Sequence, residues 1–231
     1  MASATVLPSV PMTRHRVEKV WTIVVAGGSS ERFGRPKQYE SLGGERVIDL
    51  SVTVARAASD GVVVVVPADD VSREGGVAGG RTRSESVRNG LHAVPTDVSI
   101  ICVHDAARPF ADLKLYDAVI DAVLAGADCA VPGIAVTDTI KVVDTDGTVV
   151  STPDRATLRA VQTPQAFRAA ALRAAHSTDA EGTDDAALVE AHGGRVVVVP
   201  GMEQNRKITV PADLEWARAT LDRASVAGPA R

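Results

Sequence analysis

The sequence is poor in aromatic residues, in cysteine and in long apolar runs. Aromatic side chains make up only 3% of its 231 residues, so its core must be built mainly from aliphatic ones. No stretch approaches the ~20 apolar residues that a membrane-spanning helix needs. The 2 cysteines lie in separate apolar runs and are expected to be buried thiols rather than a disulfide framework. These absences predict a cytoplasmic protein with no membrane partner.

The chain also lacks an excess of positive charge. It carries 25 Lys and Arg against 29 Asp and Glu, a formal net charge of -4. Proteins that bind nucleic acid need a positive surface to neutralise phosphates, so no nucleic-acid partner is expected. A local group of cations could still bind a small phosphorylated molecule. Residues 1–17 contain prolines and no apolar signal-peptide core, and they are predicted to be a disordered tail.

What the chain does contain is an alternation of short β-branched runs with longer Ala-rich segments. Several of the runs are apolar on both faces, as strands of a covered parallel sheet must be. Strands are predicted at 20–26, 62–66, 98–103, 128–131 and 196–199, with a shorter strand-like run at 206–210. Helices are predicted at 47–59, from Thr82 to about 92, at 113–124 and at 211–219. This order predicts one α/β domain over 18–225, with an open sheet and helices on both faces.

One segment interrupts the alternation. Residues 137–143 and 148–151 are strand-like, and the sequence Asp-Thr-Asp-Gly lies between them at 144–147. Asp-Gly favours the backbone of a hairpin turn. A protruding β-arm is therefore expected at about 137–156, where it could reach a neighbouring subunit.

The loops that follow the predicted strands are the candidate ligand sites, because open α/β sheets bind ligands at the carboxyl ends of their strands. After the first strand, residues 26–38 combine paired glycines with three cations, Arg32, Arg35 and Lys37. Glycine backbone N–H groups and cations together suit a phosphate. The spacing fits neither a Walker A loop nor a dinucleotide-binding fingerprint. An ordinary loop with solvated charges is the alternative.

Two further loops have the same placement. Residues 75–86 are glycine-rich and end on a predicted helix N-terminus, which attracts negative charge. Residues 104–109, after the third strand, carry Asp105 and Arg108 on either side of two alanines. Taken alone, a flexible loop with a helix cap explains residues 75–86 equally well. For residues 104–109 a surface ion pair is the alternative, but their place at the carboxyl end of a strand favours a functional role. The sequence has neither a Cys/His cluster for zinc nor a G-x-S-x-G elbow.

Taken in order, these segments resemble those of a known family. The segments are AGGSSERF at 26–33, PKQ at 36–38, GGRTRSES at 79–86, HDAARP at 104–109, DTIK at 138–141, DR at 154–155, TPQ at 163–165, TDDA at 183–186 and RKIT at 206–209. The set is similar to the 2-C-methyl-D-erythritol 4-phosphate cytidylyltransferases of the non-mevalonate isoprenoid pathway. The resemblance implies a Rossmann-like, glycosyltransferase-A-like nucleotidyltransferase fold, and a homodimer joined through the β-arm with an active site shared across the interface.

The resemblance also implies roles for particular residues. It places CTP against Ala26, Gly27, Gly28, Arg32, Lys37, Gly80, Ser86, Ala106 and Lys207. It places a phosphorylated polyol against Asp105, Arg108, Thr139, Arg155, Thr163, Thr183 and Lys207, of which Thr139, Arg155 and Thr163 would come from the partner subunit. As catalytic groups, Arg32 and Lys37 would stabilise transition-state charge, while Arg155 and Lys207 would orient the attacking phosphate. Mg²⁺ would bind mainly through the CTP phosphates, with no protein ligand. The chain departs from the family pattern at Ser30, where a glycine is common, and at Arg81, where an acidic residue is common.

The implied reaction transfers CMP from CTP to 2-C-methyl-D-erythritol 4-phosphate and releases pyrophosphate. A phosphate monoester has a second pKa of about 6, so its dianion can attack without a general base. Two alternatives remain. A ribitol-5-phosphate cytidylyltransferase would need much the same cations, and a catalytically silent nucleotide-binding regulator would keep the same fold.

Overall fold

The computed structural model describes residues 17–28 and 33–227, with the backbone alone at 224–227. The predicted tail, Val17 excepted, and Ser30 and Arg32 therefore lie outside the described residues. The helices are α1 (Val47–Ala58), α2 (Val71–Glu74), α3 (Arg83–Ala93), α4 (Leu113–Leu124), α5 (Ala169–Ala175), α6 (Asp185–Ala191) and α7 (Pro211–Ala227). Short 3-10 turns are η2 (Lys37–Tyr39), η3 (Ala68–Asp70) and η4 (Arg155–Thr157). No helix in the described part of the chain is long and apolar enough to cross a membrane.

The main sheet contains eight of the described strands. They are β1 (Val20–Val25), β4 (Gly61–Val66), β5 (Val77–Ala78), β6 (Ile100–Asp105), β7 (Cys129–Ala135), β10 (Arg159–Val161), β11 (Gln165–Arg168) and β12 (Val196–Pro200). Their order is β10-β7-β11-β6-β1-β4-β5, with β12 paired to β7. Strands β4, β1 and β6 run parallel, as do β4 with β5 and β7 with β12, whereas β10 and β11 run antiparallel to their neighbours. The predicted open, mostly parallel sheet is confirmed.

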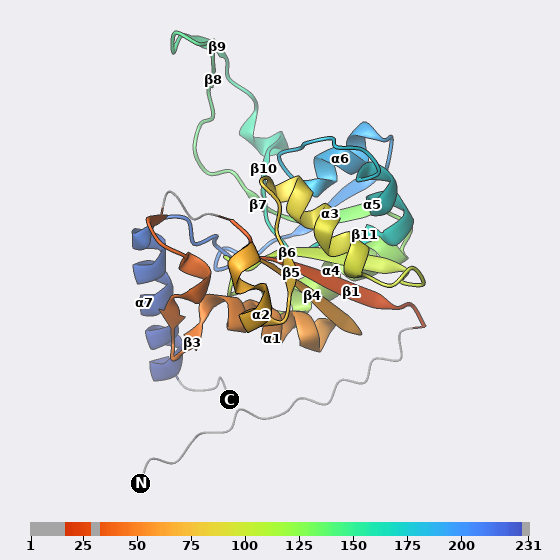
Figure 1. The fold of residues 1–231 in the computed structure, drawn as a ribbon. Helices are drawn as coiled ribbons and strands as arrows, with labels where there is room; N and C mark the ends of the chain where they lie inside the picture. Colours follow the sequence, from red (N-terminus) through yellow and green to blue (C-terminus); the bar gives the residue numbers. More distant parts are fainter. Residues whose placement is uncertain (1–16, 29–32, 228–231) are drawn as a thin grey trace.

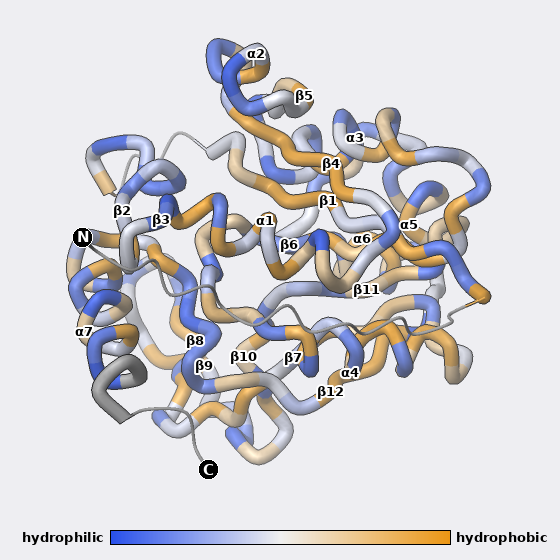
Figure 2. Tube along the Cα trace, turned by 90° about the horizontal axis from the view of Figure 1, so that it is seen from below, coloured by the Kyte–Doolittle hydropathy of each residue, from blue (hydrophilic) through white to orange (hydrophobic). Residues whose placement is uncertain are grey.

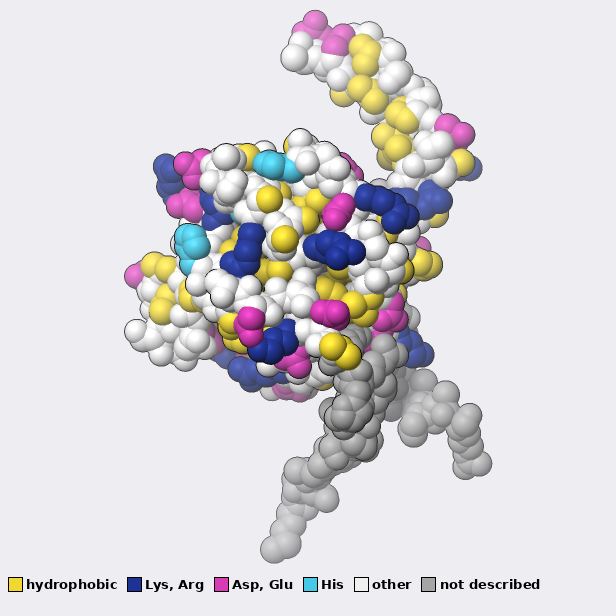
Figure 3. All heavy atoms as spheres, turned by 90° about the vertical axis from the view of Figure 1, so that its right-hand side faces the viewer, with side chains coloured by type: hydrophobic (Ala, Val, Ile, Leu, Met, Phe, Trp, Pro, Cys, Tyr) yellow, Lys and Arg dark blue, Asp and Glu magenta, His cyan; other side chains and the backbone are white. Residues whose placement is uncertain are grey.

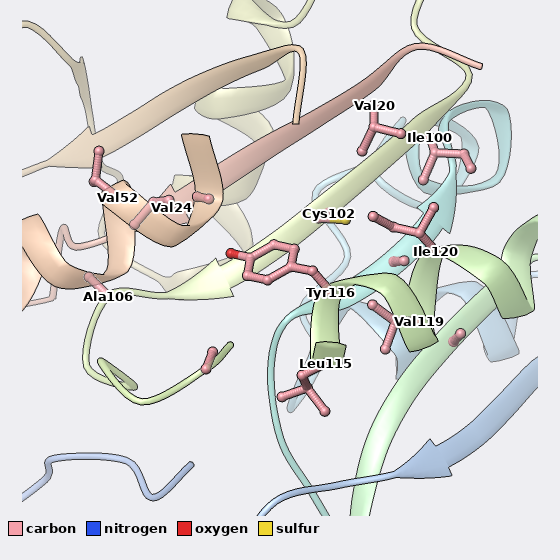
Figure 4. Close-up of a cluster of buried hydrophobic side chains, with 14 of the residues drawn as sticks. Val20, Val24, Val52, Ile100, Cys102, Ala106, Leu115, Tyr116, Val119 and Ile120 are labelled. Atoms are coloured by element: carbon pink, nitrogen blue, oxygen red, sulfur yellow. The ribbon is translucent and has the colours of Figure 1, made fainter. Parts of the chain in front are cut away.

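Helices cover both faces of this sheet because successive side chains of a strand point to opposite sides. On one face, α1 and α4 pack on Val20, Val24 and Cys102, and Figure 4 shows Tyr116 of α4 projecting toward Val24 and Ala106. On the other face, α3, α5 and α6 pack on Ile23 and other strand residues. Most of strands β1 and β4 is coloured as hydrophobic in Figure 2, as burial on both faces requires.

Local capping sets where two of the helices begin. The Thr82 hydroxyl accepts the N–H of Glu85 at 3.1 Å, and the Asp112 carboxylate accepts the N–H of Leu115 at 2.9 Å. Both caps satisfy backbone donors that a helix N-terminus leaves unpaired. The Glu85 carboxylate accepts the N–H of Arg81 at 2.7 Å, and this contact closes the turn that leads into α3.

A satellite cluster lies beside the main sheet. Here α7 packs on the small hairpin β2 (Ser41–Leu42)–β3 (Glu45–Arg46), at the left of Figure 1. Phe33, Leu42, Ile208 and Leu214 are among its buried side chains. The strand-like run predicted at 206–210 is wrong: it forms no strand, and its Ile208 N–H donates instead to the carbonyl of Ala107 at 2.8 Å. This bond attaches the segment to the loop after β6.

A separate hairpin projects from the body of the molecule. Its strands are β8 (Val142–Val143) and β9 (Val149–Ser151), and it stands clear of the sheet in Figure 1. Gly147 in its turn has a φ of +82°, a conformation that glycine adopts without strain. Hydrophobic side chains run along the arm in Figure 3. Five of them, at positions 140, 142, 143, 149 and 150, are 38% to 60% exposed.

Candidate active site

The carboxyl ends of β1, β4 and β6 lie side by side. Backbone hydrogen bonds continue past the strand ends: the N–H of Ala26 donates to Val65 at 2.7 Å, and the N–H of Ala106 donates to Val25 at 3.0 Å. The N–H of Gly79 donates to the carbonyl of Val66 at 2.8 Å. The three loops that the sequence indicated therefore meet at one edge of the sheet, as parallel strands require.

Two of these loops touch backbone to backbone. A Cβ added to Gly27 would lie 3.3 Å from the Cα of Gly79, closer than ordinary van der Waals contact. The second loop is folded onto the start of α3, where the N–H of Gly80 donates to the Ser86 hydroxyl at 3.0 Å and that hydroxyl donates to the carbonyl of Thr82 at 2.8 Å. Side chains at these glycines would separate the loops, so glycine is needed for the close approach.

A cavity of about 610 Å³ opens between the loops. This is within the usual size range of small-molecule sites. Its lining includes eight residues predicted to contact a nucleotide: Ala26, Gly27, Gly28, Lys37, Gly80, Ser86, Ala106 and Lys207. The ninth, Arg32, lies outside the described residues. Segments from both ends of the chain thus contribute cations to one space.

Asp105 is the charged centre of the cavity. Its carboxylate is 2.6 Å from the Lys207 ammonium and 3.3 Å from Nε of Arg83, and Nε of Arg108 is 4.0 Å away. Burial alone would raise the pKa of Asp105, but Arg83 and Lys207 outweigh burial and hold that pKa well below its usual value. Asp105 is therefore ionised, and it holds the cations in place around the cavity.

Thr163 and His104 form buried polar contacts beside Asp105. The Thr163 hydroxyl accepts the Asp105 N–H at 3.0 Å and lies 3.1 Å from Nδ1 of His104. Burial lowers the pKa of His104 to about 4, so its imidazole is neutral at physiological pH. These contacts fix the backbone from which Asp105 projects.

A family model for 2-C-methyl-D-erythritol 4-phosphate cytidylyltransferase matches residues 20–223 of this chain. The chain belongs to this family. The cytidylyltransferase from Frankia casuarinae is 45% identical to this chain over 226 residues, and the alignment covers 92% of this chain and 85% of the relative. The cytidylyltransferase from Streptomyces coelicolor is 43% identical over 228 residues, and the alignment covers 87% of this chain and 84% of the relative.

Solved structures agree with this membership. The 4-diphosphocytidyl-2C-methyl-D-erythritol synthase from Anaerococcus prevotii superposes with a TM-score of 0.79 at 29% identity, covering 89% of this chain and 99% of that one. The cytidylyltransferase from Thermus thermophilus gives a TM-score of 0.75 at 31% identity, covering 87% and 98%. The family that the motifs indicated is therefore confirmed.

In this member of the cytidylyltransferase family, the residues predicted to bind the acceptor do not all lie at the cavity. Asp105 and Lys207 line the cavity. The side chain of Arg108 donates to the carbonyl of Asn205 at 2.8 Å, beside Asp105. Thr183 is exposed at the surface, just before α6. The structure brings the first three together and leaves Thr183 outside the cavity lining.

The two predicted arm residues lie apart from their own chain's cavity. Thr139 and Arg155 are both exposed, and the Arg155 guanidinium donates to the carbonyl of Thr137 at 2.7 Å. The prediction that Thr163 reaches into a partner's site is wrong. Thr163 is 4% exposed and bonded to Asp105 of its own chain, because the polypeptide has already returned to the sheet before β11.

Two cations that line this cavity, Arg81 and Arg83, were not among the predicted site residues. Arg83 lines the cavity and contacts two carboxylates, Asp105 through Nε and Asp185 through Nη1 at 2.6 Å. It is the first residue of α3, in the motif at 79–86, but no side-chain direction can be inferred from that position alone. The signal that could have singled it out is a cation in the first helical turn, where the helix dipole disfavours positive charge unless carboxylates compensate it.

Proposed function

We propose that this chain transfers CMP from CTP to 2-C-methyl-D-erythritol 4-phosphate and releases pyrophosphate. The observation that carries the proposal is the shared cavity, in which two glycine loops lie next to Lys37, Lys207 and Asp105. Two phosphorylated reactants need positive charge from several sides to approach each other, and this cavity supplies it. The names of the relatives point to the same pair of substrates.

The nucleotide would occupy the glycine side of the cavity. The backbone at 26–28 has no side chain larger than a methyl group, so its N–H groups can approach a triphosphate closely. Lys37 would bind the phosphates as a point charge, and Arg32 remains a predicted second cation there. Gly80, Ser86 and Ala106 would then border the cytidine.

The polyol phosphate would occupy the side of Asp105 and Lys207. An ionised carboxylate repels a phosphate but accepts hydrogen bonds from hydroxyls, so Asp105 would bind the polyol end of the acceptor. Lys207 would bind the phosphate and aim one of its oxygens at the α-phosphorus of CTP. Attack forms a new P–O bond, and the bond to the pyrophosphate oxygen breaks.

Catalysis would come from position and fixed charge. Negative charge grows on the α-phosphoryl oxygens and on the departing pyrophosphate, and Lys37 would stabilise it. Asp105 is the one carboxylate among the described lining residues, and the cations that contact it, Lys207 and Arg83, would repel a metal ion. Mg²⁺ would therefore be held by triphosphate oxygens and water, where it would neutralise phosphate charge.

A homodimer would complete the site. The domain, 18–225, carries an arm at 137–156 with five apolar side chains that are 38% to 60% exposed in one chain (Figure 3). Contiguous exposed apolar surface of this kind is typical of an interface. Covering the arm with a partner subunit would bring Thr139 and Arg155 toward that partner's cavity. The two buried free cysteines fit the reducing cytoplasm, where we place the protein.

The deciding experiment measures pyrophosphate release from CTP and Mg²⁺ with each acceptor. Release with 2-C-methyl-D-erythritol 4-phosphate, and much slower release with ribitol 5-phosphate, is expected. The opposite preference would identify the ribitol enzyme. Binding of CTP with no release from either acceptor would instead identify a silent regulator.

A further inference from the structure

We propose that Asp185 and His176, two buried residues outside the cavity lining, are positioning residues that orient Arg83 within the cavity. The inference rests on the proposed function, because Arg83 acts only if the cavity is the active site. It concerns two titratable groups that take no part in the proposed reaction.

The Asp185 carboxylate is wholly enclosed by the protein. It is the first residue of α6, and its side chain is 0% exposed. Its Oδ2 atom accepts a hydrogen bond from Nη1 of Arg83 at 2.6 Å, and its Oδ1 atom lies 2.9 Å from Nε2 of His176. A buried carboxylate is strongly unfavourable unless it is paired and hydrogen-bonded. Both contacts therefore compensate the burial of the Asp185 charge.

Arg83 is shared between two carboxylates. Nη1 binds Asp185, while Nε on the adjoining edge of the same planar group lies 3.3 Å from Oδ1 of Asp105. Two contacts on a rigid guanidinium fix its plane, which a single contact would not do. Without Asp185, the guanidinium can rotate and form both of its hydrogen bonds with Asp105. Asp105 would then interact more strongly with Arg83 and less strongly with Lys207, whose ammonium lies 2.6 Å away.

His176 supports this arrangement from behind. It follows the last residue of α5, its side chain is 1% exposed, and its contact with Oδ1 leaves Oδ2 to Arg83. The two helices that carry the pair, α5 and α6, pack on each other and on the second core cluster. A contact held on packed helices is more rigid than one held on loops. The order of contacts is thus His176 to Asp185 to Arg83 to Asp105, from the core to the cavity.

The first test is a double-mutant cycle on pyrophosphate release, using Asp185→Asn and Arg83→Met. Asp185→Asn keeps the shape of the side chain and removes its charge. If Asp185 acts through Arg83, Asp185→Asn should lower kcat/KM by about tenfold in the wild-type background and by less than about twofold in Arg83→Met. Equal losses in both backgrounds, or no loss in the wild type, would overturn the proposal.

The second test asks whether a hydrogen-bond donor at position 176 is what matters. His176→Gln can place an amide N–H near the position of Nε2, whereas His176→Leu cannot. The glutamine variant should keep kcat/KM within about threefold of wild type, and the leucine variant should lose about tenfold. The matched control is His192→Leu, because His192 follows α6 as His176 follows α5 but is exposed. A glutamine variant as impaired as the leucine variant, with both folded by circular dichroism, would refute positioning.

Failure of the proposed function is distinguishable from failure of this inference. An inactive wild-type protein would refute the function, and CTP binding measured by calorimetry would then replace turnover in both tests. The same pattern, with a loss for Asp185→Asn that disappears in Arg83→Met, is expected in CTP affinity. Its absence there would refute the positioning role by itself.

Discussion

Replacing Lys37 by alanine removes one cation from the glycine-loop side of the cavity while leaving its support in place. Lys37 begins η2, and Tyr39 at the end of η2 donates to the Asp70 carboxylate at 2.6 Å and lies 4.5 Å from the Arg73 guanidinium. These contacts do not involve the Lys37 side chain. The substitution should therefore change charge in the cavity with little change in the fold.

The expected loss follows from the proposed role of Lys37 as a donor to growing negative charge. Removing one such donor costs roughly 3–4 kcal/mol of transition-state stabilisation, a loss of about 10²–10³ in kcat. The KM for the acceptor should change little, because the acceptor is proposed to bind on the Lys207 side. Initial rates of pyrophosphate release at varied CTP and varied acceptor would measure both quantities.

The matched control is Arg35→Ala, two residues earlier in the same loop. The Arg35 side chain is 60% exposed and forms an ion pair with Glu40 rather than lining the cavity. Its loss should leave kcat within about twofold, since exposed ion pairs contribute little. A Lys37→Ala enzyme with the wild-type rate, or equal losses for both variants, would refute the reasoning.

Three further predictions concern stability, pH and assembly. Leu214→Ala opens a cavity in the satellite cluster, which also holds Phe33. It should lower the free energy of unfolding by about 2–5 kcal/mol in urea titrations. A loss below about 1 kcal/mol would mean that the neighbouring side chains move in to fill the cavity. Burial lowers the pKa of His104 from 6.5 to about 4, so the unfolded state binds the proton first, and stability should fall by roughly 3 kcal/mol as pH drops from 6.5 to 4. Comparing urea midpoints of wild type and His104→Asn across that range tests this, and identical pH slopes would contradict it. Val142→Asp with Val149→Asp places charge on the arm and should convert the proposed homodimer to monomers in sedimentation experiments, whereas an unchanged dimer mass would exclude the arm as the interface.

Much of the candidate site could be predicted from the sequence, because glycines and charged residues that follow a strand are visible in a short stretch of sequence. The loops after β1, β4 and β6 were recognised from paired glycines next to cations, and strand ends of a parallel sheet must lie at one edge. Lys37 and Asp105 were found in this way. The prediction failed for 206–210, which was expected to be strand-like, because Ile208 packs into the satellite cluster and the segment forms no strand.

Arg83, Asp185 and His176 illustrate what the sequence did not reveal. Each has a sufficient local explanation, as a solvated cation, a helix-end acid or a helix-end histidine. Their contacts join α3 to the end of α5 and the start of α6, and Arg83 is far from the other two in the chain. No spacing rule connects such positions, since no single helix or strand carries them.

The amino-acid sequence by itself determined the alternation of strands and helices, the helix caps, the glycine loops and the family. These depend on side-chain periodicity, on backbone freedom and on hydrogen bonds between residues close in the chain. Only the tertiary structure decided which charges share a cavity, which carboxylate holds which cation, and that the Thr163 hydroxyl accepts a hydrogen bond from Asp105 of its own chain. The physical reason is that electrostatic interactions depend on distance and burial in space, and both are set by how the helices pack on the sheet.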